Sequence, residues 1–109
     1  MSVAIATVRL KCSDDEEIKM AVYWVNYDLN KSGQDYTKLI DYLKSHENWA
    51  KPLKSSFFVE TSLTVAQLRD GIMEHIDTND DVVVVPVGGQ GWGTYGLSKE
   101  LNDWMNANL

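Results

Sequence analysis

The chain has 109 residues and a formal net charge of −6, so it is long enough for one compact domain and too short for two. Hydrophobic residues make up 44% of it, which favours a packed core over disorder, and the single cysteine, Cys12, excludes an internal disulfide and a cysteine-based zinc site. No stretch is long and apolar enough to span a membrane, and the first residues lack the pattern of a signal peptide. We therefore expect a soluble, cytoplasmic protein with no membrane partner.

Residues 1–19 differ in pattern from the rest, and we interpret them as an N-terminal arm that precedes a domain over residues 20–109. Residues 3–10 have the composition of a strand, and residues 14–17 form an acidic run. We expect an extra edge strand over residues 3–10, with a linker or a start-site artefact as the alternatives.

Residues 20–30 are typical of a strand at the centre of a sheet. Both alternating faces are largely apolar, with Tyr23, Val25 and Tyr27 on one and Val22 and Trp24 on the other.

Asp28 falls on the Trp24 face, where the strand ends and the chain turns. A carboxylate at the end of a central strand is well placed for chemistry, because the sheet fixes its backbone and the following loop leaves it exposed to solvent. The alternative is that Asp28 caps the turn through its own backbone, which is the more common role of aspartate at such a position.

Helical spacing predicts a helix that starts at Gln34 or Asp35 and buries Tyr36, Leu39, Ile40 and Leu43. The extended run over residues 49–61 carries Pro52, which favours a sheet edge or a bend there. Its second part, residues 55–61, is the better strand. The two histidines, His46 and His75, fall at helix ends, where we expect them to be solvated.

Residues 64–67 match a capping box, which predicts the start of a second helix at Thr64. Leu63 can pack against Leu68 across this start. Glycine at position 71 weakens the helix, which indicates that another group packs close to it. The expected apolar stripe of this helix consists of Val65, Leu68, Ile72 and Ile76.

Residues 77–81 read as a turn, and the valine run over residues 82–87 predicts a second strand buried on both faces, with Pro86 at an unpaired position. Residues 88–96 hold five of the seven glycines. Backbone amides there could cradle phosphate, but a hairpin or crossover anchored by Trp92 and Tyr95 is favoured. Ser98 caps a last helix with an apolar patch of Leu101, Trp104 and Met105.

This order of elements predicts an α+β fold. The natural candidate is a ferredoxin-like split β-α-β sandwich, with a mainly antiparallel sheet, helices on one face and a C-terminal helix in addition.

Several short motifs also resemble a known family. They are Tyr-Asp-Leu at 27–29, Lys-Ser-Ser-Phe-Phe at 54–58, the capping segment 63–68 with the acidic turn 77–81, and the valine run 82–87. Over residues 20–87 the chain resembles the small CRISPR-associated adaptation endonucleases, and more closely their stand-alone relatives labelled SinR-like. A more distant resemblance is to the toxin family of virulence-associated protein D.

The resemblance implies a ferredoxin-like homodimer that cuts RNA or DNA with a divalent metal held by the strand-end acid of each subunit. That acid is Asp28 here, with Tyr27 beside it, and the serine of the second motif corresponds to Ser56. Asp28, Tyr27 and Ser56 are therefore the expected catalytic residues, and Asp28 is the expected ligand of Mg²⁺. Two carboxylates that meet across a dyad suit this hard cation, which would activate water and offset phosphate charge.

Contacts to nucleic acid are expected to be weak. The two arginines, Arg9 and Arg69, lie outside the loop after Asp28, and lysine does not bind phosphate bidentately as arginine does. The net charge also opposes broad binding of a polyanion. The expected contacts are Lys31, Lys51, Lys54 and the motif aromatic Phe58.

Two functions stay open at this point. One is a metal-dependent nuclease, toxin-like or related to CRISPR adaptation, and the other is a non-catalytic dimeric binding or scaffold protein. An edge strand near residues 49–53 and the C-terminal apolar patch both favour a homodimer.

Overall fold

The computed structural model describes residues 19–30 and 36–109 and contains one four-stranded sheet and three helices. The strand order is β2-β3-β1-β4, and each neighbouring pair is antiparallel. This confirms the α+β class and the antiparallel sheet, whereas the arm and its expected strand lie outside the described residues. The elements in chain order are β1 (Ala21–Asp28), α1 (Thr37–Lys44), β2 (Asn48–Ala50), β3 (Ser56–Thr61), α2 (Val65–Met73), β4 (Asp81–Val87) and α3 (Lys99–Asn108).

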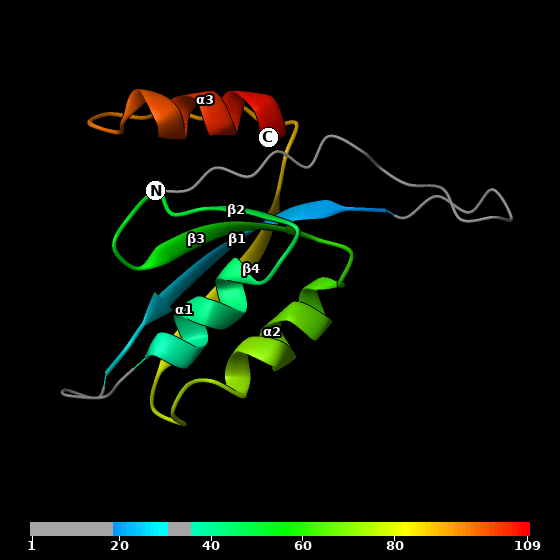
Figure 1. Ribbon diagram of the computed structural model, residues 1–109, viewed down its shortest axis with the longest axis vertical. Coiled ribbons are helices and arrows are strands. Elements are labelled where there is room, and N and C mark those ends of the chain that lie inside the picture. Colours follow the sequence, from blue (N-terminus) through cyan, green and yellow to red (C-terminus); the bar gives the residue numbers. More distant parts are fainter. Residues whose placement is uncertain (1–18, 31–35) are drawn as a thin grey trace, which may run out of the picture.

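Helices cover both faces of the sheet (Figure 1): α1 and α2 lie on one face and α3 on the other. The buried core between the sheet and α1 and α2 consists of Tyr23, Val25, Tyr27, Leu39, Leu43, Phe57, Val59, Leu68 and Ile72. The smaller core under α3 consists of Val22, Ala50, Phe58, Leu101, Trp104 and Met105. No helix among the described residues is both long and apolar enough to cross a membrane.

The central position of β1 is confirmed, because β3 and β4 pair with its two sides. The prediction for β4 is wrong: among the described strands it lies at the edge of the sheet and pairs only with β1. Val83 and Val85 are 59% and 41% exposed, since α3 does not extend over them. A valine run therefore indicated a strand correctly but not its burial, while Pro86 does occupy an edge strand, where proline is tolerated.

The capping box of α2 is present with both of its hydrogen bonds. The backbone N–H of Gln67 donates to Thr64 Oγ1 over 3.1 Å, and the backbone N–H of Thr64 donates to Gln67 Oε1 over 2.9 Å. Val65, however, is 41% exposed and does not belong to the buried stripe, which consists of Leu68 and Ile72 within α2.

The helix α1 begins at Thr37, with Tyr36 as its N-cap residue, so its expected start at Gln34 or Asp35 lies in the part of the chain that is not described. It meets α2 at Gly71, where an added Cβ would overlap the hydroxyl of Tyr42. This confirms the close packing predicted at that glycine.

The two histidines meet at Tyr42. The ring of His75 stacks on Tyr42 with centroids 4.8 Å apart, and His46 meets the same ring edge-on at 4.9 Å. Both histidines are half-buried, so the expectation that they are solvated is wrong.

Hydrogen bonds between buried side chains fix α3 on the sheet. The indole Nε1 of Trp104 donates to Asn48 Oδ1 over 3.1 Å, and Asn48 Nδ2 donates to Asn108 Oδ1 over 2.9 Å. Trp104 is 1% exposed. Leu101, Trp104 and Met105 are thus part of the core under α3. The prediction that they form an exposed apolar patch available for dimerisation is wrong.

The glycine-rich segment carries the chain from the end of β4 to α3 on the other side of the sheet (Figure 1), which agrees with the predicted crossover. Tyr95 is fully exposed, so it does not anchor this segment, whereas Trp92 is 42% exposed and more than half of its surface is covered. The N-cap at Ser98 is confirmed, since its Oγ accepts a hydrogen bond from the backbone N–H of Leu101 over 3.1 Å.

Candidate functional site

Two exposed carboxylates stand side by side where β1 ends and β4 begins. Asp28 is the last residue of β1, and its partner across the strand pair is Asp81, the first residue of β4. Side chains directly opposite in an antiparallel pair have their Cβ atoms about 4.5–5.5 Å apart on the same face. The strand register therefore adds Asp81 to the site. Asp81 was missed in the sequence, where it reads as the end of a turn.

The carboxylate of Asp28 accepts no hydrogen bond from any residue that the structure describes. The interpretation of Asp28 as a turn cap is therefore not borne out. Asp80 takes that role instead: its carboxylate accepts hydrogen bonds from the backbone N–H of Asn30 over 2.8 Å and from that of Asp77 over 2.8 Å. Asp81 Oδ2 accepts one bond, from Asn30 Nδ2 over 3.2 Å.

The two carboxylates line a hollow of about 380 Å³ on the face of the sheet that carries α3. Ser56 of β3 lies in the wall of the same hollow, opposite Asn26 of β1 in the strand register. Its side chain is buried, and its Oγ has no hydrogen-bond partner in the described part of the chain. The structure thus brings the predicted residues Asp28 and Ser56 together.

Tyr27 does not join them through its hydroxyl. Because side chains alternate along a strand, its ring lies on the opposite face from Asp28, in the core beneath α1 and α2. The hydroxyl donates to the backbone carbonyl of Lys54 over 3.4 Å, and burial raises the pKa of this phenol above its usual value. Tyr27 is among the residues that line the hollow, but its ring is part of the core on the other face of the sheet.

The predicted nucleic-acid contacts that the structure describes, Lys51, Lys54 and Phe58, are not gathered at the hollow. Lys31 lies outside the described residues, and none of the other three lines the hollow. Lys54 is exposed. Phe58 is 4% exposed and stacks against Trp24 and Trp104, with ring centroids 5.8 and 5.5 Å away.

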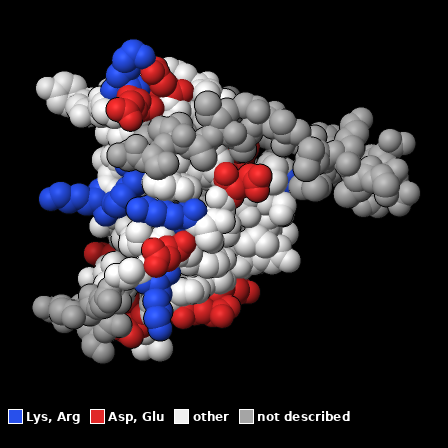
Figure 2. Space-filling view, viewed as in Figure 1, with Lys and Arg blue, Asp and Glu red and all other residues white. Residues whose placement is uncertain are grey.

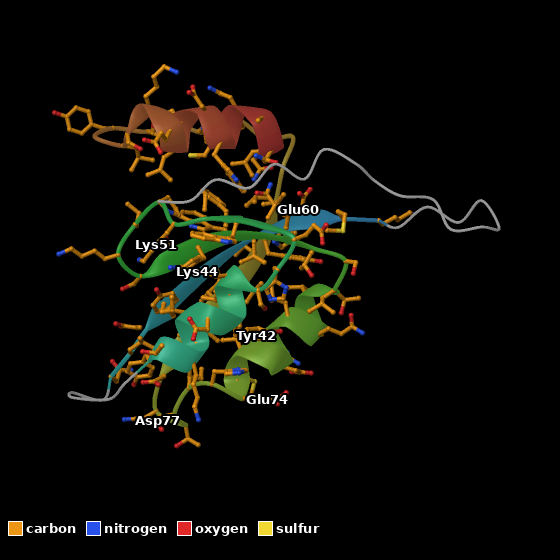
Figure 3. All side chains as sticks on the ribbon, viewed as in Figure 1. Tyr42, Lys44, Lys51, Glu60, Glu74 and Asp77 are labelled. Carbon is orange, nitrogen blue, oxygen red and sulfur yellow. The ribbon has the colours of Figure 1, made fainter. Side chains whose placement is uncertain are left out.

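Lys51 is half-buried and donates to the backbone carbonyls of Leu53 and Lys54, so its ammonium group holds the turn between β2 and β3. Loss of solvation, together with the nearby charge of Lys44 (Figure 3), lowers the pKa of Lys51. Figure 2 shows a short band of basic side chains across the middle of this face, with acidic side chains above and below it.

The donor atoms at the hollow suit a hard divalent cation. Mg²⁺ is usually held by one or two carboxylates and completes its coordination with water and substrate phosphate. Asp28 and Asp81 supply two carboxylates. Among the described residues there is no group of three or more histidine, cysteine, aspartate or glutamate side chains that could form a fuller metal cage.

Comparisons of the chain with known protein families, curated proteins and solved structures found no match.

Proposed function

We propose that the protein is a metal-dependent endonuclease that cuts the phosphodiester backbone of RNA or DNA in the hollow beside Asp28. The observation that carries this proposal is the pair of exposed carboxylates, Asp28 and Asp81, on adjacent strand ends. Without a cation, two like charges this close repel each other. A site that maintains such a pair is suited to bind positive charge.

Asp28 and Asp81 would hold Mg²⁺, which would supply an activated water and offset negative charge on the scissile phosphate. Ser56 offers a hydroxyl without a partner in the wall of the same hollow. We assign it the role of a hydrogen-bond donor to a phosphate oxygen. The resemblance to the CRISPR-associated adaptation endonucleases agrees with these assignments.

We also propose that the fold is ferredoxin-like. In the sheet order β2-β3-β1-β4, β3 lies between β1 and β2, and β1 lies between β3 and β4. Each helix of the α1 and α2 pair connects two strands that are separated by one antiparallel strand, which is the arrangement of a split β-α-β unit.

A homodimer formed along β4 is the third part of the proposal. The outer edge of β4 is not paired with another described strand, and Val83 and Val85 add exposed apolar surface beside it. Such an edge is a template for pairing with a second copy. Light scattering should then give about twice the chain mass of 12.3 kDa.

Replacement of Val83 and Val85 by lysine should return the protein to a monomer, since charged side chains block edge pairing. The matched control is Met73→Lys on α2, where the methionine is 56% exposed. A wild-type protein that is a monomer at micromolar concentration would contradict the dimer.

The second candidate function is a non-catalytic binding protein of the same fold. It is favoured by the absence of any lysine or arginine among the described residues that line the hollow. Affinity for nucleic acid depends strongly on such contacts to phosphate.

One assay separates the two functions. Wild type, Asp28→Asn and Asp81→Asn are incubated with single-stranded RNA or double-stranded DNA in Mg²⁺, Mn²⁺ or EDTA. The nuclease predicts metal-dependent cleavage by wild type that both variants lose, whereas Asp103→Asn, a change on the exposed side of α3, keeps it. Cleavage that survives both substitutions, or no cleavage by wild type with either metal, would contradict the nuclease.

A further inference from the structure

A second cavity, of about 340 Å³, lies on the same face of the sheet between the glycine-rich segment and α3. Trp24 and Phe58 form its wall on the sheet, Trp92 contributes from the glycine-rich segment and Met105 from α3. None of the described residues that line it has a charged side chain. Its volume falls at the lower end of the range for small-ligand sites, and its walls are mainly apolar as in such sites.

Two features of these walls indicate the kind of ligand. Trp24 and Phe58 stack with ring centroids 5.8 Å apart, while Trp92 is 42% exposed, so aromatic surface is available at the cavity. The indole Nε1 of Trp24 is buried and has no hydrogen-bond partner among the residues that the structure describes. A buried indole N–H usually has an acceptor, which points to a ligand that brings one. The ligand is therefore a planar, uncharged ring with an acceptor atom.

The cavity adjoins the hollow that contains the carboxylates, because Leu53 lines both. Trp24 and Asp28 lie on the same face of β1, four residues and about 13 Å apart along the strand. A chain of linked nucleotides can span this distance. A nucleobase is a planar ring with acceptor atoms, and it stacks on aromatic side chains irrespective of its identity.

We propose that this cavity binds an unpaired nucleobase of the substrate whose backbone lies at Asp28, so that the preferred substrate is single-stranded. A base that is paired within a duplex cannot enter a cavity of this size. The inference rests on the proposed function for the place of the phosphate. The cavity itself can be tested without any cleavage.

The test uses a trinucleotide with 2-aminopurine at its centre, whose fluorescence falls when the base stacks on an aromatic ring. The titration is performed on the full chain in EDTA, which prevents metal-dependent cleavage. We expect saturable quenching by wild type. We expect about tenfold weaker binding by Trp92→Ala, because one stacking surface is lost, and weaker binding by Trp24→Phe, which keeps the ring and removes the N–H.

The matched control is Trp49→Phe, since Trp49 packs on the opposite face against the core beneath α1 and α2. This variant should bind as wild type does. An unlabelled trinucleotide with a central base should displace the probe, and the same trinucleotide with an abasic centre should not. Because Trp92 is partly exposed, Trp92→Ala decides the outcome if Trp24→Phe fails to fold.

Equal displacement by the abasic trinucleotide, or unchanged binding in Trp92→Ala, would overturn the base site. The failure of the nuclease is a separate result. If the probe binds through Trp92 but wild type cuts no substrate, the base site stands and the nuclease does not. If cleavage depends on metal and Asp28 but is the same in Trp92→Ala and on duplex substrate, the nuclease stands and the base site does not.

Discussion

The two faces of the sheet are covered to different extents. Beneath α1 and α2, the inward side chains of β1 and β3 are buried except for the partly buried Ala21, and Val25, Phe57 and Val59 have 0% exposure. On the other face, α3 covers Val22 and Phe58 and leaves the other end of the sheet open. The covered surfaces supply stability, and the open end of this face is where side chains are accessible to a ligand.

The open half of this face is the end of the sheet that carries Asp28, Asp81 and Val83. It is exposed because of the length of α3 and the place where α3 is attached. This helix has ten residues and therefore spans about 15 Å, whereas the eight residues of β1 span about 27 Å. Its hydrogen bonds attach it to Asn48 on β2, at the edge of the sheet opposite β4. The end of the sheet that carries Asp28 and Asp81 is left uncovered.

The largest expected effect comes from loss of the α3 contact. Trp104→Ala should lower the free energy of unfolding by about 3–5 kcal/mol, because it removes a buried aromatic ring and the donor to Asn48. Equilibrium unfolding in urea measures this loss of stability. Val83→Ala on the open half should change stability by less than about 0.5 kcal/mol. A cost below about 1 kcal/mol for Trp104→Ala would mean that α3 does not stabilise the sheet.

A change at Gly71 tests the packing on the fully covered side. Gly71→Ala should cost about 1–3 kcal/mol, because the new Cβ overlaps the side chain of Tyr42. In a Tyr42→Ala background the same change should be neutral or stabilising by up to about 1 kcal/mol, since alanine favours a helix over glycine. Equal costs in both backgrounds would show that α1 and α2 do not meet there.

The smallest effect is a pH dependence on the same side. Burial lowers the pKa of His46 below its usual value of 6.5. The unfolded chain therefore takes up the proton first, so this contribution to stability is complete above pH 6.5 and is lost as the pH falls through the lowered pKa. His46→Gln should flatten that part of the curve of unfolding free energy against pH. An unchanged slope in the variant would assign the dependence to other groups.

Local signals in the sequence predicted the parts of the fold that local structure determines. The apolar faces of residues 20–30 identified the central strand, and the capping box identified the start of α2 at Thr64. Pro52 indicated the bend between two strands correctly, since β2 ends at Ala50 and β3 begins at Ser56.

The remaining features depend on contacts between distant residues. Burial of Trp104 rests on a hydrogen bond to Asn48 across 56 positions in the chain, and no local pattern indicates it. Asp81 faces Asp28 only because of the register between β1 and β4. At the candidate site, the sequence therefore identified Asp28 and Ser56 but not the second carboxylate.

The central claim is that Asp28 and Asp81 form a cation site, and thermal unfolding in EDTA and in Mn²⁺ tests it most directly. In EDTA, Asp28→Asn should be at least as stable as wild type, because one of two repelling charges is removed. At Mn²⁺ concentrations about 100 times the dissociation constant, wild type should gain about 2.7 kcal/mol. Asp28→Asn should gain little, and the control Asp70→Asn on α2 should respond as wild type does. No stabilisation of wild type by Mn²⁺, or equal stabilisation of Asp28→Asn, would contradict the claim.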